Sequence, residues 1–288
     1  MNTRSITPIA TTIRHAVGSV FLTVLLGASM PAAAQTSATK EQIVVALSNP
    51  GKPGLVSVKL VGGSITVMGY NGKDVVIDAS SRAGRSSRRE PAAAATGMKR
   101  IETSNSFDLT ADESDNQVSI KTNSWKNPID LVIKVPQRFS LQLGTVQNGD
   151  ITVENVAGEL EVSNVNGAIQ LNQVSGSAVA NTVNGPVKAT FKSVTAGAPM
   201  AFSTVNGQVD VTFPSNTKAA LKLKSDHGEI YSDFDLVAEK SPAKVTRTNQ
   251  GGVYRVSIDD WTYGKVNGGG AEVMMKTLNG NIYIRKAK

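Results

Sequence analysis

The sequence predicts an all-β protein, and within that class a single-stranded β-solenoid (β-helix) of nine-residue Gly-x-apolar-x-apolar units with irregular capping ends. Glycine recurs every nine residues from Gly149 to Gly185. After each glycine, apolar residues mostly alternate with polar ones, which is the period of a strand with one buried face. No stretch after residue 34 keeps a helical period.

The repeat predicts which side chains face the interior. The second and fourth residues after each glycine should line one continuous core, and these are Ile151, Val153, Leu160, Val162, Ile169 and Leu171. The seventh residue is a valine in four units and is expected to point inward at the corner, which a solvated hairpin turn would not allow. These valines are Val156, Val165, Val174 and Val183. They favour a solenoid over a hairpin meander, although the spacing alone fits both.

Asparagine precedes several of the corner glycines at a longer period. Asn148, Asn166 and Asn184 lie 18 residues apart, and Asn206 and Asn279 follow. With two units per coil, each asparagine would stack on the one a coil below, so that their amides could pair along the axis. Asn-Gly is also the strongest short hairpin signal, which keeps a hairpin reading open.

Residues 1–34 are predicted to be a signal peptide. Arg4 and Arg14 form a basic start, an apolar stretch covers 17–26, and three alanines precede Gln35. The apolar stretch of about 10 residues is too short to span a bilayer, which requires roughly 20. Residues 35–288 contain no longer apolar segment, so we expect an exported protein without a transmembrane segment in its mature part. The chain has no cysteine and therefore no disulfide or lipid-bearing thiol.

Residues 35–288 are expected to form one β-solenoid domain that carries a mobile basic loop at 80–100. That segment has a single acid and a Pro-Ala-Ala-Ala-Ala centre, and it has too little apolar surface to order itself. It is either a solubilising insertion or a tether that contacts anionic surfaces. Its basic residues are Arg82, Arg85, Arg88, Arg89, Lys99 and Arg100.

Alternating segments on both sides of the regular repeat look like degenerate copies of the same unit. Gly-Ser-Ile-Thr-Val at 63–67, Ile-Lys-Val-Pro at 133–136, the Asn-Gly units and Thr-Leu-Asn-Gly-Asn-Ile at 277–282 resemble the bacterial putative-adhesin β-strand-repeat family. The resemblance covers residues 43–286, and members of this family are often known only as a domain of unknown function. It implies an envelope-associated β-helix, in the periplasm or on the surface of a bacterium. It supplies no catalytic residues and no cofactor.

The charge of the chain bears on its partners. The net charge is +7 with the predicted signal included. A mildly basic exported protein suits an anionic envelope polymer or membrane surface, whereas weak charge and export both argue against nucleic acid.

Candidate catalytic groups are sparse, so the sequence predicts a non-enzyme without a metal site. His227, the one histidine after residue 34, is expected in a turn, and the acids at 112–116 are expected in a hairpin turn, not a calcium loop. Asp233 and Asp235, like Glu159 and Glu161, have a spacing near that of glycosidase carboxylates. Polar residues on the outside of a solenoid reach that spacing by alternation alone. The alternative function is a β-helix carbohydrate-active enzyme, a hydrolase or lyase, that uses such an acidic cluster.

Aromatic residues near the C-terminus give the only binding signal. Alternation places Tyr231 and Tyr283 outward, where their rings could stack on sugars or could pack under a capping loop. The candidate binding surface consists of Tyr231, Asp233, Trp261, Tyr263, Tyr283 and Arg285. The sequence therefore predicts a non-catalytic, adhesin-like envelope scaffold that binds a polymer, a glycan or a protein partner.

Overall fold

The computed structural model describes residues 40–81, 107, 109–122, 128–236, 239–240, 244–250, 253–259 and 261–288. For the ranges between 237 and 260, it describes the backbone alone. The predicted signal peptide and residues 82–100 of the basic loop lie outside the described residues. Ser80 and Ser81, which the predicted loop included, instead end strand β4 (Asp74–Ser81). Every regular element of the described chain is a β-strand, which confirms the all-β prediction.

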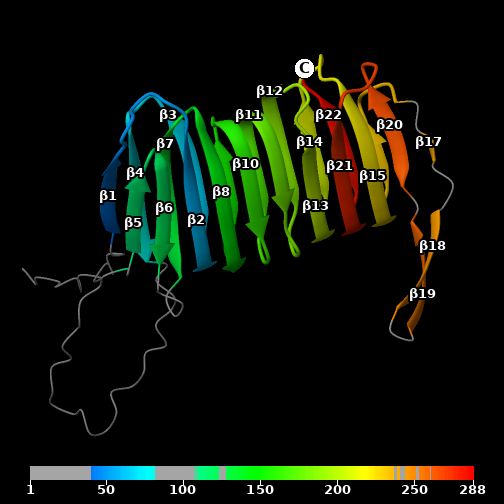
Figure 1. The fold of residues 1–288 in the computed structure, drawn as a ribbon, viewed down its shortest axis with the longest axis horizontal. Coiled ribbons are helices and arrows are strands. Elements are labelled where there is room, and N and C mark those ends of the chain that lie inside the picture. The colour runs from blue at the N-terminus through cyan, green and yellow to red at the C-terminus, as the bar shows by residue number, and fades with distance from the viewer. Residues whose placement is uncertain are drawn as a thin grey trace, which may run out of the picture. The chain divides into compact units, whose positions relative to one another are not determined.

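The strands stack in two faces, and the chain passes from one face to the other at each corner (Figure 1). Neighbouring strands within each face pair in parallel, as a solenoid requires and a meander does not. The first face runs in the order β7 (Ile129–Pro136), β3 (Ile65–Tyr70), β9 (Ile151–Glu154), the start of β11 (Ile169–Asn181), β12 (Val187–Val194), β14 (Val209–Phe213), β22 (Ile282–Lys286) and β16 (Ile230–Ser232).

The second face consists of the other strand of each coil. It runs in the order β6 (Gln117–Thr122), β2 (Gly54–Gly62), β8 (Phe139–Gln147), β10 (Ala157–Asn164), the end of β11, β13 (Met200–Asn206), β21 (Ala271–Asn279) and β15 (Ala219–His227).

The register follows the glycine repeat in the middle of the stack. Ile151 pairs with Ile169, and Ile169 pairs with Val187, which are steps of one 18-residue coil. Beyond these coils the step lengthens, because Val187 pairs with Val209 and Val209 with Ile282. The regular spacing therefore covers only the central coils.

The core lies between the two faces. The six aliphatic side chains expected inside are all buried, with no more than 2% of their surface exposed. Burial of each such side chain contributes roughly 1.5–3 kcal/mol, so these inward rows supply much of the stability of the fold. Phe191, Phe202 and Phe213 extend this core toward the C-terminal coils, where their rings pack against one another.

The prediction for the corner valines is wrong at every second corner. Val156 and Val174 are buried, but Val183 is 39% exposed and Val165 is only half-buried. The two corners of a coil differ physically. Where the second face passes into the first, a polar residue just before the valine takes the inward position, as Asn164 and Thr182 do.

Those inward polar residues form a ladder of hydrogen bonds between coils. Each donates its side-chain hydrogen to the carbonyl of a corner glycine in the neighbouring coil, as Thr204 Oγ1 does to Gly185 O at 2.8 Å. A side chain could not replace that glycine: Gly185 has φ +151°, and a Cβ there would lie 2.3 Å from Gly167 O. The other donors are Thr145, Asn164, Thr182, Ser225 and Thr277.

The predicted asparagine ladder is present on the outside of the same corner. Asn184 Nδ2 donates to Asn166 Oδ1 at 2.8 Å, and Asn206 and Asn279 extend the series. Asn148 departs from the pattern. Its coil has one more residue before the corner glycine than the next coil has, and Asn148 adopts φ +49°. Asn166 Nδ2 consequently bonds to Val146 O instead.

Coil order in space differs from chain order at both ends. The coil of β2 and β3 comes earlier in the chain than the coil of β6 and β7, yet it lies nearer the middle of the stack. The C-terminal coil, β21 and β22, lies between β13–β14 and β15–β16, as the red strands in Figure 1 show. The sequence did not predict this intercalation.

Antiparallel strands complete both ends of the stack. β1 (Lys40–Ala46) pairs with β4, and β4 pairs with β7, while β5 (Leu109–Ser114) pairs with β6. Asp115 and Asn116 form the tight turn between β5 and β6 with φ values of 49° and 61°, which confirms the hairpin predicted there. At the other end, β20 (Thr262–Val266) pairs with β15, and β17 (Glu239–Lys240) pairs with β20. β18 (Lys244–Gln250) and β19 (Val253–Asp259) form a separate hairpin.

Across the described residues, no helix has the length and apolarity needed to cross a membrane.

Candidate binding surface on the C-terminal strands

Two tyrosines stack on the outside of the first face. Tyr231 on β16 and Tyr283 on β22 are register partners, and Tyr283 alternates with buried Ile282 and Ile284. Their ring centroids lie 5.3 Å apart with 9° between the planes, and Tyr231 is 46% exposed. The outward orientation predicted for both tyrosines is confirmed.

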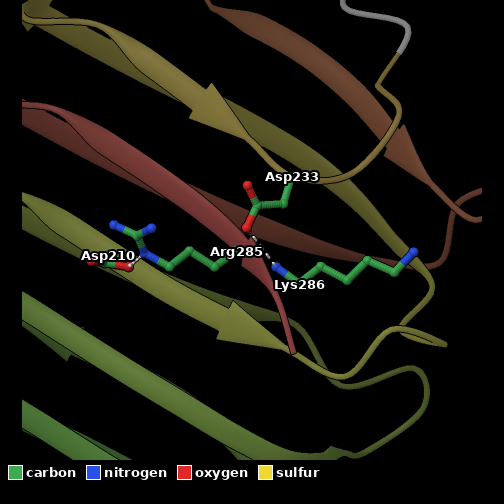
Figure 2. Close-up of polar contacts among 4 residues, drawn as sticks. All are labelled: Asp210, Asp233, Arg285 and Lys286. Atoms are coloured by element: carbon green, nitrogen blue, oxygen red, sulfur yellow. Dashed lines mark hydrogen bonds and ion pairs between the residues drawn. The ribbon is translucent and has the colours of Figure 1, made fainter. Parts of the chain in front are cut away.

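An ion pair lies beside the Tyr283 ring. Arg285 Nε lies 2.7 Å from Asp210 Oδ1 (Figure 2). The guanidinium carbon lies 5.1 Å from the centroid of the Tyr283 ring. Asp210 is on the outer surface of β14, yet only 6% of it is exposed. The hydrogen bond to Asp210, followed by its charge, raises the pKa of Arg285. Arg285 is therefore held in one position beside the tyrosine.

Asp233 joins this group through the backbone. β16 ends at Ser232, where Asp233 N donates to Ile284 O at 2.9 Å and Asp233 Oδ2 accepts from Lys286 N at 3.3 Å (Figure 2). The chain then bends, and Phe234 turns inward with 8% of its surface exposed. Asp233 and Asp235 both lie beyond the end of β16, so they are not on one strand as the sequence predicted, although both are exposed on either side of Phe234.

The two phenol groups are also held in place. Tyr231 Oη donates to the Glu229 carboxylate, and that hydrogen bond, together with the negative charge, raises the pKa of Tyr231. Asn281 Nδ2 donates to Tyr283 Oη at 3.1 Å, while Asn281 Oδ1 accepts from Glu229 N at 3.0 Å. We call Asp210, Tyr231, Asp233, Tyr283 and Arg285 the tyrosine cluster.

The tyrosine cluster combines exposed ring surface with fixed hydrogen-bonding groups. Aromatic rings offer an apolar face to a ligand, and a carboxylate and a guanidinium can bond to its polar edge. Tyr231 and Glu229 set a hydroxyl beside a carboxylate, but their hydrogen bond raises the pKa of the phenol instead of lowering it as in an activated nucleophile. The arrangement suits binding.

The other two predicted aromatics lie on the second face. Tyr263 on β20 is the register partner of Lys222 on β15, and Trp261 precedes β20. The Trp261 ring has Lys222 Nζ at 4.8 Å and Lys224 Nζ at 5.9 Å from its centroid. The six predicted residues thus divide into two groups, with Tyr231, Asp233, Tyr283 and Arg285 together and Trp261 and Tyr263 apart.

Sequence reasoning missed the partners of both groups. Asp210 precedes Arg285 by 75 residues, and only the parallel pairing of β14 with β22 brings the two together. Lys222 is likewise distant in sequence from Trp261. Alternation predicts which side of a strand a residue occupies, but it does not predict the neighbouring strand.

A groove of about 670 Å³ crosses the second face over β8, β10 and β11. Glu159 and Glu161, the other acid pair with glycosidase-like spacing, both line this groove. Both are exposed, and Glu161 Oε2 accepts from Gln142 Nε2 at 3.1 Å.

Metal ligands do not gather in the described part of the chain, where no group of three or more His, Cys, Asp or Glu side chains could hold an ion. His227 is the last residue of β15 and is exposed. Its register partner is Asn279, so it occupies the asparagine position of the corner just before Gly228.

Comparison with known proteins gives a family match and a set of similar solved structures. A family model described as Toastrack DUF4097 matches residues 56–262. A putative cell adhesion protein from Clostridium sporogenes ATCC 15579 is 11% identical, with 87% of this chain and 100% of that chain covered and a TM-score of 0.43. A putative adhesin from Bacteroides fragilis NCTC 9343 is 12% identical, with 87% and 98% covered and a TM-score of 0.36. No curated protein matches the chain.

Proposed function

The chain belongs to the Toastrack DUF4097 family, and on that premise we propose that it is a non-catalytic, adhesin-like scaffold that binds an envelope glycan. The membership confirms the resemblance seen in its repeats. The proposal places the protein outside the cytoplasm, in the periplasm or on the cell surface, after removal of residues 1–34. In this proposal, each nine-residue unit forms half of one coil in the central stack.

The stacked pair of Tyr231 and Tyr283 is the observation that carries the proposal. A sugar ring has an apolar face of C–H groups, which an aromatic ring covers, and a rim of hydroxyl groups, which charged side chains bond. Asp233 and Arg285 lie beside the rings and can serve that rim. Arg285 offers a planar set of donors, which fixes the orientation of a bound hydroxyl pair.

Preorganisation adds to the suitability of this surface. Glu229 and Asn281 fix the phenol groups, and Asp210 fixes Arg285. A ligand that binds would immobilise few additional rotamers, and ordering a flexible side chain costs about 0.5–1.5 kcal/mol. Groups already held in place bind more tightly than the same groups on a mobile loop.

A binding screen of residues 35–288 tests the proposal. The probes are neutral and N-acetylated oligosaccharides and peptidoglycan fragments, and binding is compared among the wild type, Tyr231→Ala and Tyr283→Ala. Val61→Ala is the control, because it removes an exposed apolar side chain that belongs to neither the tyrosine cluster nor its neighbouring strands. We expect weaker glycan binding in the first two variants alone. Equal binding by all four proteins would contradict the proposed site.

The groove over Glu159 and Glu161 favours a second candidate function, that of a carbohydrate-active hydrolase. Residues two apart on a parallel strand have Cα atoms about 6.6 Å apart, which lies within the range of glycosidase carboxylates. These two acids lie side by side on β10, however, whereas a glycosidase pair flanks the scissile bond. Release of reducing ends from polysaccharide, abolished by Glu159→Gln or Glu161→Gln, would establish this alternative.

A further inference from the structure

A second surface, separate from the tyrosine cluster, lies at the C-terminal end of the second face. Lys222 and Lys224 alternate with buried Leu221 and Leu223 on β15, so both point outward. Lys224 is the register partner of the exposed Lys276 on β21. Neighbouring strands lie about 4.8 Å apart, and alternate residues of one strand about 6.8 Å apart. Three lysines thus occupy adjoining positions of one sheet.

Trp261 fixes two of these lysines in place. The ammonium groups of Lys222 and Lys224 lie 4.8 Å and 5.9 Å from the centroid of its ring. An indole face attracts cations through its quadrupole, so the ring holds two like charges near each other. The packing leaves only 17% of the Lys224 side chain exposed. An ordered cluster of this kind differs from lysines that extend freely into solvent.

The positive charge of the cluster is only partly neutralised. Asp226 Oδ1 lies 3.6 Å from Lys224 Nζ. Among the side chains described, those of residues 40–81, 107, 109–122, 128–236 and 261–288, no carboxylate lies at ion-pairing distance from Lys222 or Lys276. Like charges held together repel one another, and an anionic ligand would relieve that repulsion.

We propose that the lysine–tryptophan patch, Lys222, Lys224, Trp261 and Lys276, binds an acidic polysaccharide. Charge complementarity selects an anion, and the adjoining Tyr263, which is 38% exposed, offers a ring against which a sugar can pack. A polymer with a carboxylate on each sugar can reach several of these ammonium groups at once, so its contacts reinforce one another. This patch lies on the opposite face from the tyrosine cluster and functions independently of it.

Affinity measurements with polygalacturonate test the patch. The proteins are residues 35–288 in wild-type form, a Lys222→Gln/Lys276→Gln variant, and a Lys73→Gln/Lys188→Gln variant that loses the same charge elsewhere. Neutral dextran is the uncharged probe. We expect the patch variant to lose about tenfold or more in affinity at low salt, and the control to stay within about twofold of the wild type. The lost part should be the salt-sensitive part.

Two further arms make the outcome decisive. Trp125→Phe leaves Trp261 as the single tryptophan, so its fluorescence should change with polygalacturonate and stay constant with dextran. That readout separates the patch from the basic segment at 82–100. Equal losses in both lysine variants, or unchanged Trp261 emission at saturation, would overturn the proposal. Phosphatidylglycerol vesicles that bind through the same lysines, with no binding of polygalacturonate, would assign the patch to lipid instead.

Discussion

Thr204 illustrates how single residues join the coils. Its buried hydroxyl donates to Gly185 O, and Thr204→Val keeps the shape while leaving that carbonyl without its partner. A buried group left unsatisfied costs about 1–3 kcal/mol, so we expect a loss of that size in the free energy of unfolding. The neighbouring Val205 is 38% exposed, and Val205→Thr should change stability by less than about 0.5 kcal/mol. Equal effects in urea denaturation would show that the ladder contributes nothing.

Glu113 is expected to make the stability of the fold depend on pH. Its carboxylate accepts hydrogen bonds from Ser48 N, Ser48 Oγ and Asn116 N at 3.0, 2.8 and 2.9 Å. These bonds lower the pKa of Glu113, and the bonds from Ser48 have the largest effect. A lowered folded-state pKa gives stability that is present above the unfolded pKa and lost as pH falls through the folded value.

The expected result follows from that sign. Wild-type protein should unfold at a higher temperature than Glu113→Gln at neutral pH, and the difference should close as pH falls below about 4. Thermal melts of both proteins from pH 7 to pH 3 measure it. A gap that persists unchanged into acid would show that the charge of Glu113 is not involved.

Individual side-chain positions were predictable where one physical rule decides them. Alternation alone places Leu171 inside and Tyr283 outside, because strand geometry sends successive side chains to opposite faces. The inward prediction for Val183 rested on its corner position and not on this rule. Alternation continued from Ala180 places Thr182 inside and Val183 outside, as the structure shows. The hydroxyl of Thr182 takes the interior instead, since the Gly167 carbonyl requires a donor there.

Strand pairing was predictable only where the repeat is regular. Equal glycine spacing fixes the register of β9, β11 and β12, but nothing local to residues 271–288 indicates that they enter between earlier coils. β22 is bonded to β14 on one side and to β16 on the other. Asp210 belongs to the tyrosine cluster only because β22 lies beside β14. The sequence therefore did not predict Asp210 as a member.

The intercalated C-terminal coil should be essential for folding. Deletion of residues 271–288 would expose the edges of β13 and β14 and would remove the parallel partners of β15 and β16. Open edges with apolar inner faces favour association between chains. We therefore expect the truncated protein to lose its cooperative thermal transition and to aggregate, as circular dichroism and size-exclusion chromatography would detect. A soluble truncated monomer with a sharp transition would contradict the stated role of this coil.

At the scale of the whole molecule, the role of the basic segment at 82–100 remains a prediction. Deletion of Arg82 to Gly97 should leave the melting temperature nearly unchanged, because the segment cannot bury enough apolar surface to stabilise the fold. If the segment contacts anionic surfaces, the deletion should also remove the salt-sensitive part of binding to anionic vesicles or lipopolysaccharide. Undiminished binding at low salt would show that the basic segment is only a solubilising insertion.

Mapping of a bound oligosaccharide by nuclear magnetic resonance tests the central claim, a binding scaffold without catalysis, most directly. Isotope-labelled residues 35–288 would be titrated with the tightest-binding oligosaccharide of the screen, and the sugar would be analysed after prolonged incubation. We expect amide shifts to concentrate on β14, β16 and β22 around Tyr231, Tyr283 and Arg285, and the sugar to remain intact. Shifts centred on Glu159 and Glu161, together with shorter sugar products, would contradict the account.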